Sequence, residues 1–160
     1  MPKAPKGDPR TVEYWDERVK SAKNDDDMLF IDGRREEYWR RVADQLALWK
    51  DLRVLDVACG FGHFAGIFQT NLYDGIDFSG EMIALANRKH PSYRFKRIDI
   101  HQDEPYDGDW DVIFEVNSLR SLGMTADDFI KKYAKNARMA VATLEADEFR
   151  IAELYPQRGR

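Results

Sequence analysis

Three aspartates and a pair of glycines have types and positions that could hold a small polar ligand. Asp56 comes late in a short apolar run, and Gly60 and Gly62 follow it in the segment ACGFG. Glycine lets a backbone turn tightly and approach a ligand, because it carries no Cβ atom. An acid at the entry of such a turn disfavours a pyrophosphate and favours a ligand that carries an ammonium group. The alternative is a glycine turn that serves only close packing.

The other two aspartates occur at comparable places farther along the chain. Asp77 stands 17 positions after Gly60, where a carboxylate can accept hydrogen bonds from both hydroxyls of a ribose. Asp99 lies in the segment FKRIDI, where a carboxylate or the neighbouring backbone can accept the amino group of an adenine. A ribose, an adenine and an ammonium group together point to one adenosyl cofactor.

The pattern of the sequence predicts an α/β framework for these side chains. From residue 52 onward short apolar runs alternate with helical segments, which is typical of βαβ units and of a parallel sheet with helices on both faces. The expected strands are 53–58, 71–77, 93–98, 111–117 and 138–145, and the expected helices are 63–70, 79–88 and 125–136. We therefore predict a three-layer αβα sandwich whose doubly wound, mainly parallel sheet has about five strands.

The first fifty residues are predicted to cover this core. Residues 1–10 are rich in proline and cations and are expected to form a mobile N-terminal arm. Residues 11–50 are expected to contain two helices, at about 11–20 and 34–50, that act as a lid or cover. Residues 51–160 are then the ligand-binding core, and all three parts belong to one domain.

Composition narrows the function classes. The 160 residues carry a formal net charge of −4, without the basic surplus that usually accompanies nucleic-acid binding. The single Cys59 excludes an intrachain disulfide, and no long apolar span is present, so we expect a cytoplasmic protein without a membrane partner. His63, His90 and His101 show no metal-ligand spacing with Cys59, so no metal site is expected.

The ordered motifs resemble those of the class I S-adenosylmethionine-dependent methyltransferases. The resembling segments are VLDVACGFG (54–62), YDGIDFSGEMIALANRKHP (73–91), RIDI (97–100) and WDVIFEVNSL (110–119). The resemblance implies a Rossmann-like methyltransferase fold, S-adenosylmethionine as cofactor and S-adenosylhomocysteine as product. It implies that the cofactor is bound by Asp56, Ala58, Cys59, Gly60, Gly62, Asp77, Phe78, Met82, Asp99, Ile100 and Glu115.

Two departures from the family pattern stand out. Ala58 occupies the place of the first motif glycine. The family sheet usually ends in an antiparallel hairpin, and the short C-terminus predicts that this final β-hairpin is lacking. Strand five would then expose an edge that must be covered by residues 147–155, by the N-terminal helices or by a second subunit. A homodimer is therefore expected.

Methyl transfer needs few catalytic side chains, because alignment of the acceptor with the methyl carbon in a dry pocket supplies much of the rate enhancement. If the acceptor must lose a proton, Glu115 and His101 are the candidate catalytic bases. Asn117, Ser118 and Arg120 could orient the acceptor, and Arg120 would suit a carboxylate or phosphate. The plainer alternatives are that Glu115 faces solvent or offers only its backbone carbonyl to the cofactor, and that His101 and Arg120 are solvated loop residues.

Other candidates also have two interpretations. Tyr14 and Trp15 could form an aromatic lid that contacts the substrate, or they could serve packing alone. His63 is expected to start a helix and line the site, and Cys59 is expected to be a small buried thiol rather than a nucleophile. Arg34 could bind an acidic group or lie on a solvated helix face.

Three functions compete. The first is a methyltransferase that acts on an O or N acceptor of unknown identity, with a small molecule favoured over a macromolecule. The second is a non-catalytic S-adenosylmethionine-binding subunit or a methyltransferase that depends on a partner chain. The third is an NAD-dependent dehydrogenase, which GFGHFA (60–65) and Asp77 permit but Asp56 and the motif series disfavour.

Overall fold

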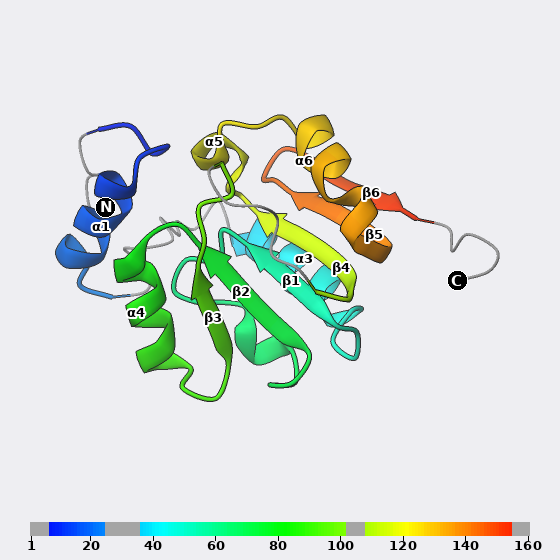
Figure 1. Ribbon diagram of the computed structural model, residues 1–160, viewed down its shortest axis with the longest axis horizontal. Helices are drawn as coiled ribbons and strands as arrows, with labels where there is room; N and C mark the ends of the chain where they lie inside the picture. The colour runs from blue at the N-terminus through cyan, green and yellow to red at the C-terminus, as the bar shows by residue number, and fades with distance from the viewer. Residues whose placement is uncertain (1–6, 25–35, 102–107, 155–160) are drawn as a thin grey trace.

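A computed structural model describes residues 7–24, 36–101 and 108–154. Its centre is a six-stranded sheet in the order β3-β2-β1-β4-β5-β6 (Figure 1). The strands are β1 (Val54–Val57), β2 (Tyr73–Asp77), β3 (Arg94–Arg97), β4 (Trp110–Val116), β5 (Ala137–Leu144) and β6 (Phe149–Glu153). The helices are α1 (Val12–Ser21), α3 (Glu36–Ala47), α4 (Gly80–Lys89), α5 (Leu119–Leu122) and α6 (Ala126–Tyr133), with short 3-10 helices η1 (Ala65–Ile67) and η2 (Ala134–Asn136).

The predicted doubly wound sheet is confirmed. Strands β1 to β5 run parallel to one another, and the chain reverses its direction of travel across the sheet between β3 and β4. The carboxyl ends of β1 and β4 are therefore adjacent at a topological switch point, where ligands bind in open α/β sheets.

The sheet has six strands, where about five were predicted. Residues 149–153 form β6, which pairs antiparallel with β5, and the turn between them is closed by the Glu145 N–H donating to the Glu148 carbonyl at 3.2 Å. Of the three covers considered for the edge of strand five, the chain uses its own C-terminal segment. The signal was weak because Phe149, Ile151 and their neighbours alternate over five residues only.

Two apolar layers enclose the sheet. Tyr38, Val42 and Leu46 of α3 pack with η1 on one face, and the Tyr38 hydroxyl donates to the Leu144 carbonyl at 2.5 Å. Phe129 and Tyr133 of α6 pack on the other face. Figure 1 shows α3 and α6 on opposite sides of the sheet, so α3 belongs to the core and not to a separate cover.

Helix α1 behaves differently from α3. It packs beside α4 at the β3 end of the molecule, where Trp15 and Val19 contact a small cluster with Phe61 and Met82 (Figure 1). The Ser79 hydroxyl donates to Asp16 at 2.6 Å, which ties α1 to the start of α4. The lid role of residues 11–20 stays a prediction.

Helix boundaries follow the capping residues. Thr125 and Asp128 form the predicted capping box of α6, and the Ser79 hydroxyl accepts from the Met82 N–H at 3.1 Å at the start of α4. The helix predicted at 63–70 is wrong: this segment contains turns and the single 3-10 turn η1. Gly66 and the aromatic residues of HFAGIFQT favour a helix only weakly.

Parts of the predicted elements lie outside the described residues. These are residues 1–6 of the predicted arm, and Arg34 at the start of the second helix. Residues 7–10 form a turn in which the Asp8 carboxylate accepts from the Arg10 guanidinium at 2.7 Å. Within the part of the chain that the structure describes, no helix is both long and apolar enough to span a lipid bilayer.

Candidate functional site

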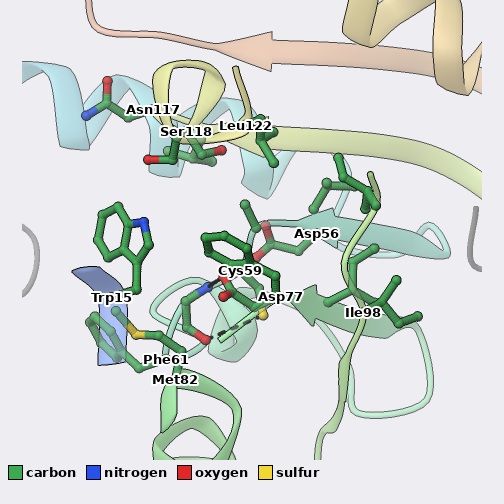
Figure 2. A pocket seen from close by; sticks show the side chains of 18 of the residues that line it. Trp15, Asp56, Cys59, Phe61, Asp77, Met82, Ile98, Asn117, Ser118 and Leu122 are labelled. Carbon is green, nitrogen blue, oxygen red and sulfur yellow. Dashed lines mark hydrogen bonds between the residues drawn. The ribbon is translucent and has the colours of Figure 1, made fainter. Parts of the chain in front are cut away.

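A cavity opens at the carboxyl ends of β1, β2 and β4 and beside the segment that follows β3 (Figure 2). We call it the central cavity. Its walls come from the turn after β1, the start of α4, the end of α5 and the two residues before it, and single residues of α1 and α3. The residues that line it are Trp15, Trp39, Asp56, Val57, Ala58, Cys59, Gly60, Phe61, His63, Phe64, Ile76, Asp77, Phe78, Met82, Ile98, Asp99, Ile100, His101, Val116, Asn117, Ser118, Ser121 and Leu122.

The turn after β1 is built from left-handed backbone. Ala58, Gly60 and Gly62 have φ angles of 60°, 57° and 77°, a region that glycine enters without steric cost. At Gly62 space matters as well, because an added Cβ atom would lie 2.6 Å from the Phe95 ring. Gly60 is thus required by its backbone conformation, and Gly62 is required by both its backbone conformation and its packing against Phe95.

Ala58 carries the strain of this turn, because a side chain in the left-handed region costs roughly 1–2 kcal/mol. Ala58→Gly removes that strain, but it also raises the conformational entropy of the unfolded chain, which opposes part of the gain. We expect the variant to raise the free energy of unfolding by about 1 kcal/mol, measured by urea titration. Ala65→Gly, at a buried position in η1, is the control and should destabilise. A loss of stability in Ala58→Gly would contradict the explanation.

Asp77 ties the turn to the second strand. Its carboxylate accepts the Gly60 N–H and the Ser79 N–H, each at 2.9 Å. Burial raises the pKa of Asp77 to about 6, and the nearby charge of Asp16 acts in the same direction. A carboxylate has about four acceptor positions, so two hydroxyls of a ligand can still bind to Asp77 from the cavity.

Asp56 is the second acid of the cavity. It is 2% exposed and accepts the Tyr73 hydroxyl at 2.7 Å. Burial raises the pKa of Asp56 to about 7, opposed by the Tyr73 hydrogen bond and assisted by the charge of Asp77. A cationic ligand group beside Asp56 would favour its ionised form and gain from the attraction.

The titration of Asp56 makes a prediction about stability. Its pKa is about 7 in the folded chain against an ordinary 3.8, so the folded state binds more protons than the unfolded state between these values. Stability therefore falls with rising pH in this window, by up to about 1.4 kcal/mol per pH unit. Asp56→Asn keeps an oxygen for Tyr73 and should gain stability relative to wild type from about pH 4 to about pH 7. Urea titrations at several pH values measure this difference, and a constant difference would contradict the shift.

The segment after β3 supplies the third acid. Asp99 lines the cavity between Ile98 and Ile100, which are both buried. The Asp99 carboxylate accepts the His101 N–H at 3.0 Å, and the Ile98 N–H donates to the Asp77 carbonyl at 2.9 Å. The structure thus brings the three predicted aspartates to one cavity.

Four of the predicted site residues do not line the central cavity. Gly62 packs below the turn against Phe95. Tyr14 stacks edge-on with Trp15, at 5.0 Å between ring centroids, and only Trp15 lines the cavity. Arg120 is exposed on α5, so the prediction that it orients an acidic acceptor at this wall is not supported by its position.

Glu115 is the fourth predicted site residue that does not line the cavity. The prediction that its side chain takes a proton directly from the acceptor is therefore corrected. The side chain is fully buried, and one carboxyl oxygen accepts both the N–H and the hydroxyl of Ser118 at 2.8 Å. Burial raises the pKa of Glu115 well above its ordinary range, and Glu145 adds to the shift. A carboxyl group that lies behind the cavity wall cannot take a proton from a ligand directly.

The remaining predicted residues do line the cavity. Asn117 has a φ of 52°, which turns the chain sharply between β4 and Ser118, and His101 is exposed at the rim. Burial raises the pKa of the Cys59 thiol, which keeps it protonated and agrees with a structural thiol. No group of three or more His, Cys, Asp or Glu side chains among the described residues could hold a metal ion.

Sequence reasoning missed part of the wall. Trp39, Phe64, Ser121 and Leu122 line the cavity, and the Trp39 ring stacks on Phe64 with centroids 5.9 Å apart. The sequence predicted the second helix only as part of a lid or cover. Trp39 follows the buried Tyr38, so it points to a different side of α3, and that side was identifiable only from the position of the helix.

The fold and the cavity define an α/β protein with a ligand site at the switch point of the sheet. Residues 54–143 match the model of the family described as methyltransferase domain. The match covers more than half of the chain, and the chain belongs to this family.

Similar proteins agree with the family. A dTDP-3-amino-3,6-dideoxy-alpha-D-glucopyranose N,N-dimethyltransferase from Streptomyces fradiae is 38% identical over 72 residues, 39% of this chain and 28% of that protein. Phosphoethanolamine N-methyltransferase 1 from Haemonchus contortus has a TM-score of 0.60 at 14% identity, over 84% of this chain and 32% of that chain. The magnesium protoporphyrin IX methyltransferase of Synechocystis PCC 6803, solved with bound SAM, has a TM-score of 0.55 at 16% identity, over 89% and 77% of the two chains.

These solved structures establish the likeness of fold. The chain spans 28% of the length of the curated relative and 51% of a Mesorhizobium loti methyltransferase structure that it resembles.

Proposed function

We propose that this protein is an S-adenosylmethionine-dependent methyltransferase that transfers a methyl group to a nitrogen or oxygen acceptor. The observation that carries the proposal is the convergence of Asp56, Asp77 and Asp99 on one cavity around the turn after β1. The bound forms of related structures support S-adenosylmethionine as the cofactor, and the family match supports the reaction.

The residues of the cavity fit each part of this cofactor. Asp77 would accept the ribose hydroxyls, Asp99 and the backbone at Ile100 would take the adenine, and Asp56 with the turn at Gly60 would hold the methionine end. When bound, the cofactor supplies an electrophilic methyl group. Carboxylates around the cavity suit a ligand with a sulfonium and an ammonium group.

The chain's own contribution to the reaction is positioning and exclusion of water. Trp15 and Trp39 border the cavity from α1 and α3, and their apolar rings would keep water from the reacting centre. The positive charge is spread over sulfur, the methyl carbon and the acceptor when a sulfonium transfers its methyl group to a neutral acceptor, so a dry cavity favours the transition state. Asn117 and Ser118 supply polar atoms that can orient the acceptor.

A dehydrogenase is less compatible with this geometry. Rossmann dinucleotide sites hold a pyrophosphate at the N-terminus of the helix that follows the glycine turn. Here the turn leads into η1, a 3-10 helix of three residues, and Asp56 and Asp77 would repel a pyrophosphate.

Further parts of the proposal concern partners and location. We propose a small-molecule acceptor and a cytoplasmic protein.

A homodimer is retained as a proposal, although β6 covers the edge of β5 and a second subunit would have to pair with β6 instead. A partner-dependent enzyme is the second candidate. Light scattering of the purified protein, alone and with ligand, tests self-association.

The test of function is a calorimetric titration with S-adenosylmethionine, S-adenosylhomocysteine and NAD in parallel. We expect both adenosyl ligands to bind with micromolar affinity and NAD to give no heat. Binding of NAD alone would overturn the proposal in favour of a dehydrogenase. Binding of S-adenosylhomocysteine without methyl transfer to any acceptor in a screen of amines, phenols and carboxylates would favour the non-catalytic subunit.

A further inference from the structure

Two carboxyl groups lie behind the central cavity and have unusual surroundings. Glu115 sits near the end of β4 and Glu145 directly follows β5. The Glu115 Oε1 atom and the Glu145 Oε2 atom are both buried and have no hydrogen-bond donor. Glu145 lies two residues beyond Thr143, which is the register partner of Glu115 in β5. Buried polar atoms are nearly always paired, so two orphaned acceptors at neighbouring strand ends require an explanation.

A proton shared between the two carboxyl groups explains the two orphaned oxygens. Glu145 acts on Glu115 both as a neighbouring charge and as a hydrogen-bond partner. Two carboxylates cannot form a hydrogen bond without a proton between them, and like charges at short range favour protonation of one group. With Glu115 protonated on Oε1, that atom donates to Glu145 and both orphaned oxygens are satisfied.

Among the described residues no ion pair joins Glu115 or Glu145 to a cation. Thr143 lies beside Glu115 in the register of β4 and β5, and its hydroxyl also has no partner. Arg150 stands opposite Thr143 in β6, but its guanidinium binds Asp127 at 2.5 Å. The pair therefore keeps its proton rather than an ion-pair partner.

Ser118 connects this pair to the cavity. It lines the central cavity, on the side that faces Trp15 and Met82 across the opening (Figure 2). Its hydroxyl donates to the Glu115 Oε2 atom at 2.8 Å, which leaves the lone pairs of the hydroxyl oxygen free to accept. At the other end Glu145 is partly exposed, so the line from Ser118 through Glu115 to Glu145 runs from the cavity to solvent.

We propose that Ser118, Glu115 and Glu145 form a proton exit path for the methyl acceptor. This rests on the proposed methyltransferase function and adds a requirement to it, namely an acceptor that carries an N–H or O–H group. Ser118 is the residue that touches the acceptor, and Glu115 and Glu145 act behind it.

The transfer balances in atoms and charge. The acceptor nitrogen or oxygen forms a bond to the methyl carbon, the carbon–sulfur bond breaks, and its electron pair stays on sulfur. The acceptor proton passes to the Ser118 oxygen while the Ser118 proton passes to the Glu115 Oε2 atom. Glu115 releases its Oε1 proton to Glu145, and Glu145 releases one proton to water.

Infrared spectroscopy of the full chain tests the path without an identified acceptor. The difference spectrum of wild type minus Glu115→Gln at neutral pH should contain the carbonyl band of one neutral carboxylic acid. Wild type minus Glu81→Gln, a change at an exposed glutamate of α4, should lack it. Absence of the band from the Glu115 difference spectrum would overturn the proposal.

Two further variants test the ends of the path and remain informative if Glu115→Gln fails to fold. Ser118→Ala should shift the acid band, because the carboxyl loses a donor. Glu145→Gln should shift the band and slow its exchange in deuterated water, since the amide cannot relay a proton. An unchanged band in Ser118→Ala, or unchanged exchange in Glu145→Gln, would refute that end of the path.

Binding separates this proposal from the proposed function. S-adenosylhomocysteine should bind to Glu145→Gln as tightly as to wild type, because Glu145 does not line the cavity. If wild type binds the ligand but lacks the acid band, the exit path fails alone. If the band is present and no adenosyl ligand binds, the methyltransferase function fails, and the exit path loses its role.

Discussion

Asp77→Ala is expected to lower the affinity for S-adenosylhomocysteine by at least about a hundredfold. Hydrogen bonds to a charged group are worth about 1.5–3 kcal/mol each, and each 1.4 kcal/mol is about tenfold in affinity. The loss of both ribose hydrogen bonds therefore costs at least about 3 kcal/mol, which is more than a hundredfold in affinity. The variant also leaves the Gly60 and Ser79 N–H groups without the acceptor that now holds them at 2.9 Å, which loosens the turn that faces the ligand.

Calorimetric titration measures this affinity, and a thermal melt shows whether the variant is folded. Asp109→Ala is the control, because this aspartate is exposed and contacts Arg138 rather than the cavity. Unchanged affinity in a folded Asp77→Ala variant would remove Asp77 from the ligand site. If the alanine variant does not fold, Asp77→Asn keeps the size of the side chain, and its affinity should also fall because one donor of the turn then faces an amide N–H group.

Gly62→Ala is expected to lower the free energy of unfolding by about 2–5 kcal/mol. The new Cβ atom would lie 2.6 Å from the Phe95 ring and in a left-handed conformation with φ at 77°. The backbone strain costs roughly 1–2 kcal/mol, and overpacking of a close-packed core adds about 1–3 kcal/mol. Urea denaturation measures the change.

The neighbouring glycine supplies a matched control. Gly60 has a φ of 57°, but the nearest atom to an added Cβ is the Met82 sulfur at 3.9 Å. Gly60→Ala should therefore show the backbone strain without the clash and cost about 1–2 kcal/mol. Equal losses in the two variants would mean that Phe95 moves aside and that packing at Gly62 is not the cause.

The alternation of strands and helices was predictable because each element carries a local signal. β1, β2, β4 and β5 are mostly buried strands with apolar residues at their core positions, and α6 has its capping box in the sequence. The helix expected at 63–70 is absent because the preceding turn and Gly66 favour compact turns. No single residue in this segment indicates that the connection between β1 and β2 is short. Strand β6 was missed because a five-residue edge strand gains most of its stability from pairing with β5.

The cavity shows the same division. Asp56, Asp77 and Asp99 were identified from the sequence, since acids at strand ends in a parallel sheet must converge on one side. Glu115 was identified as notable, but its role was read wrongly, because direct contact with a ligand depends on which face of β4 the side chain occupies. Trp39 was missed because its contact with the cavity depends on the placement of α3.

The sequence by itself determined the class of fold and the acids of the cavity, because strand order, turn glycines and charge are local or periodic properties of the chain. Only the tertiary structure decided which side chains share a wall, which carboxyls meet behind Ser118, and how the edge of β5 is covered. These depend on distances between residues far apart in the sequence, and burial at those contacts sets the protonation of Glu115 and Asp56.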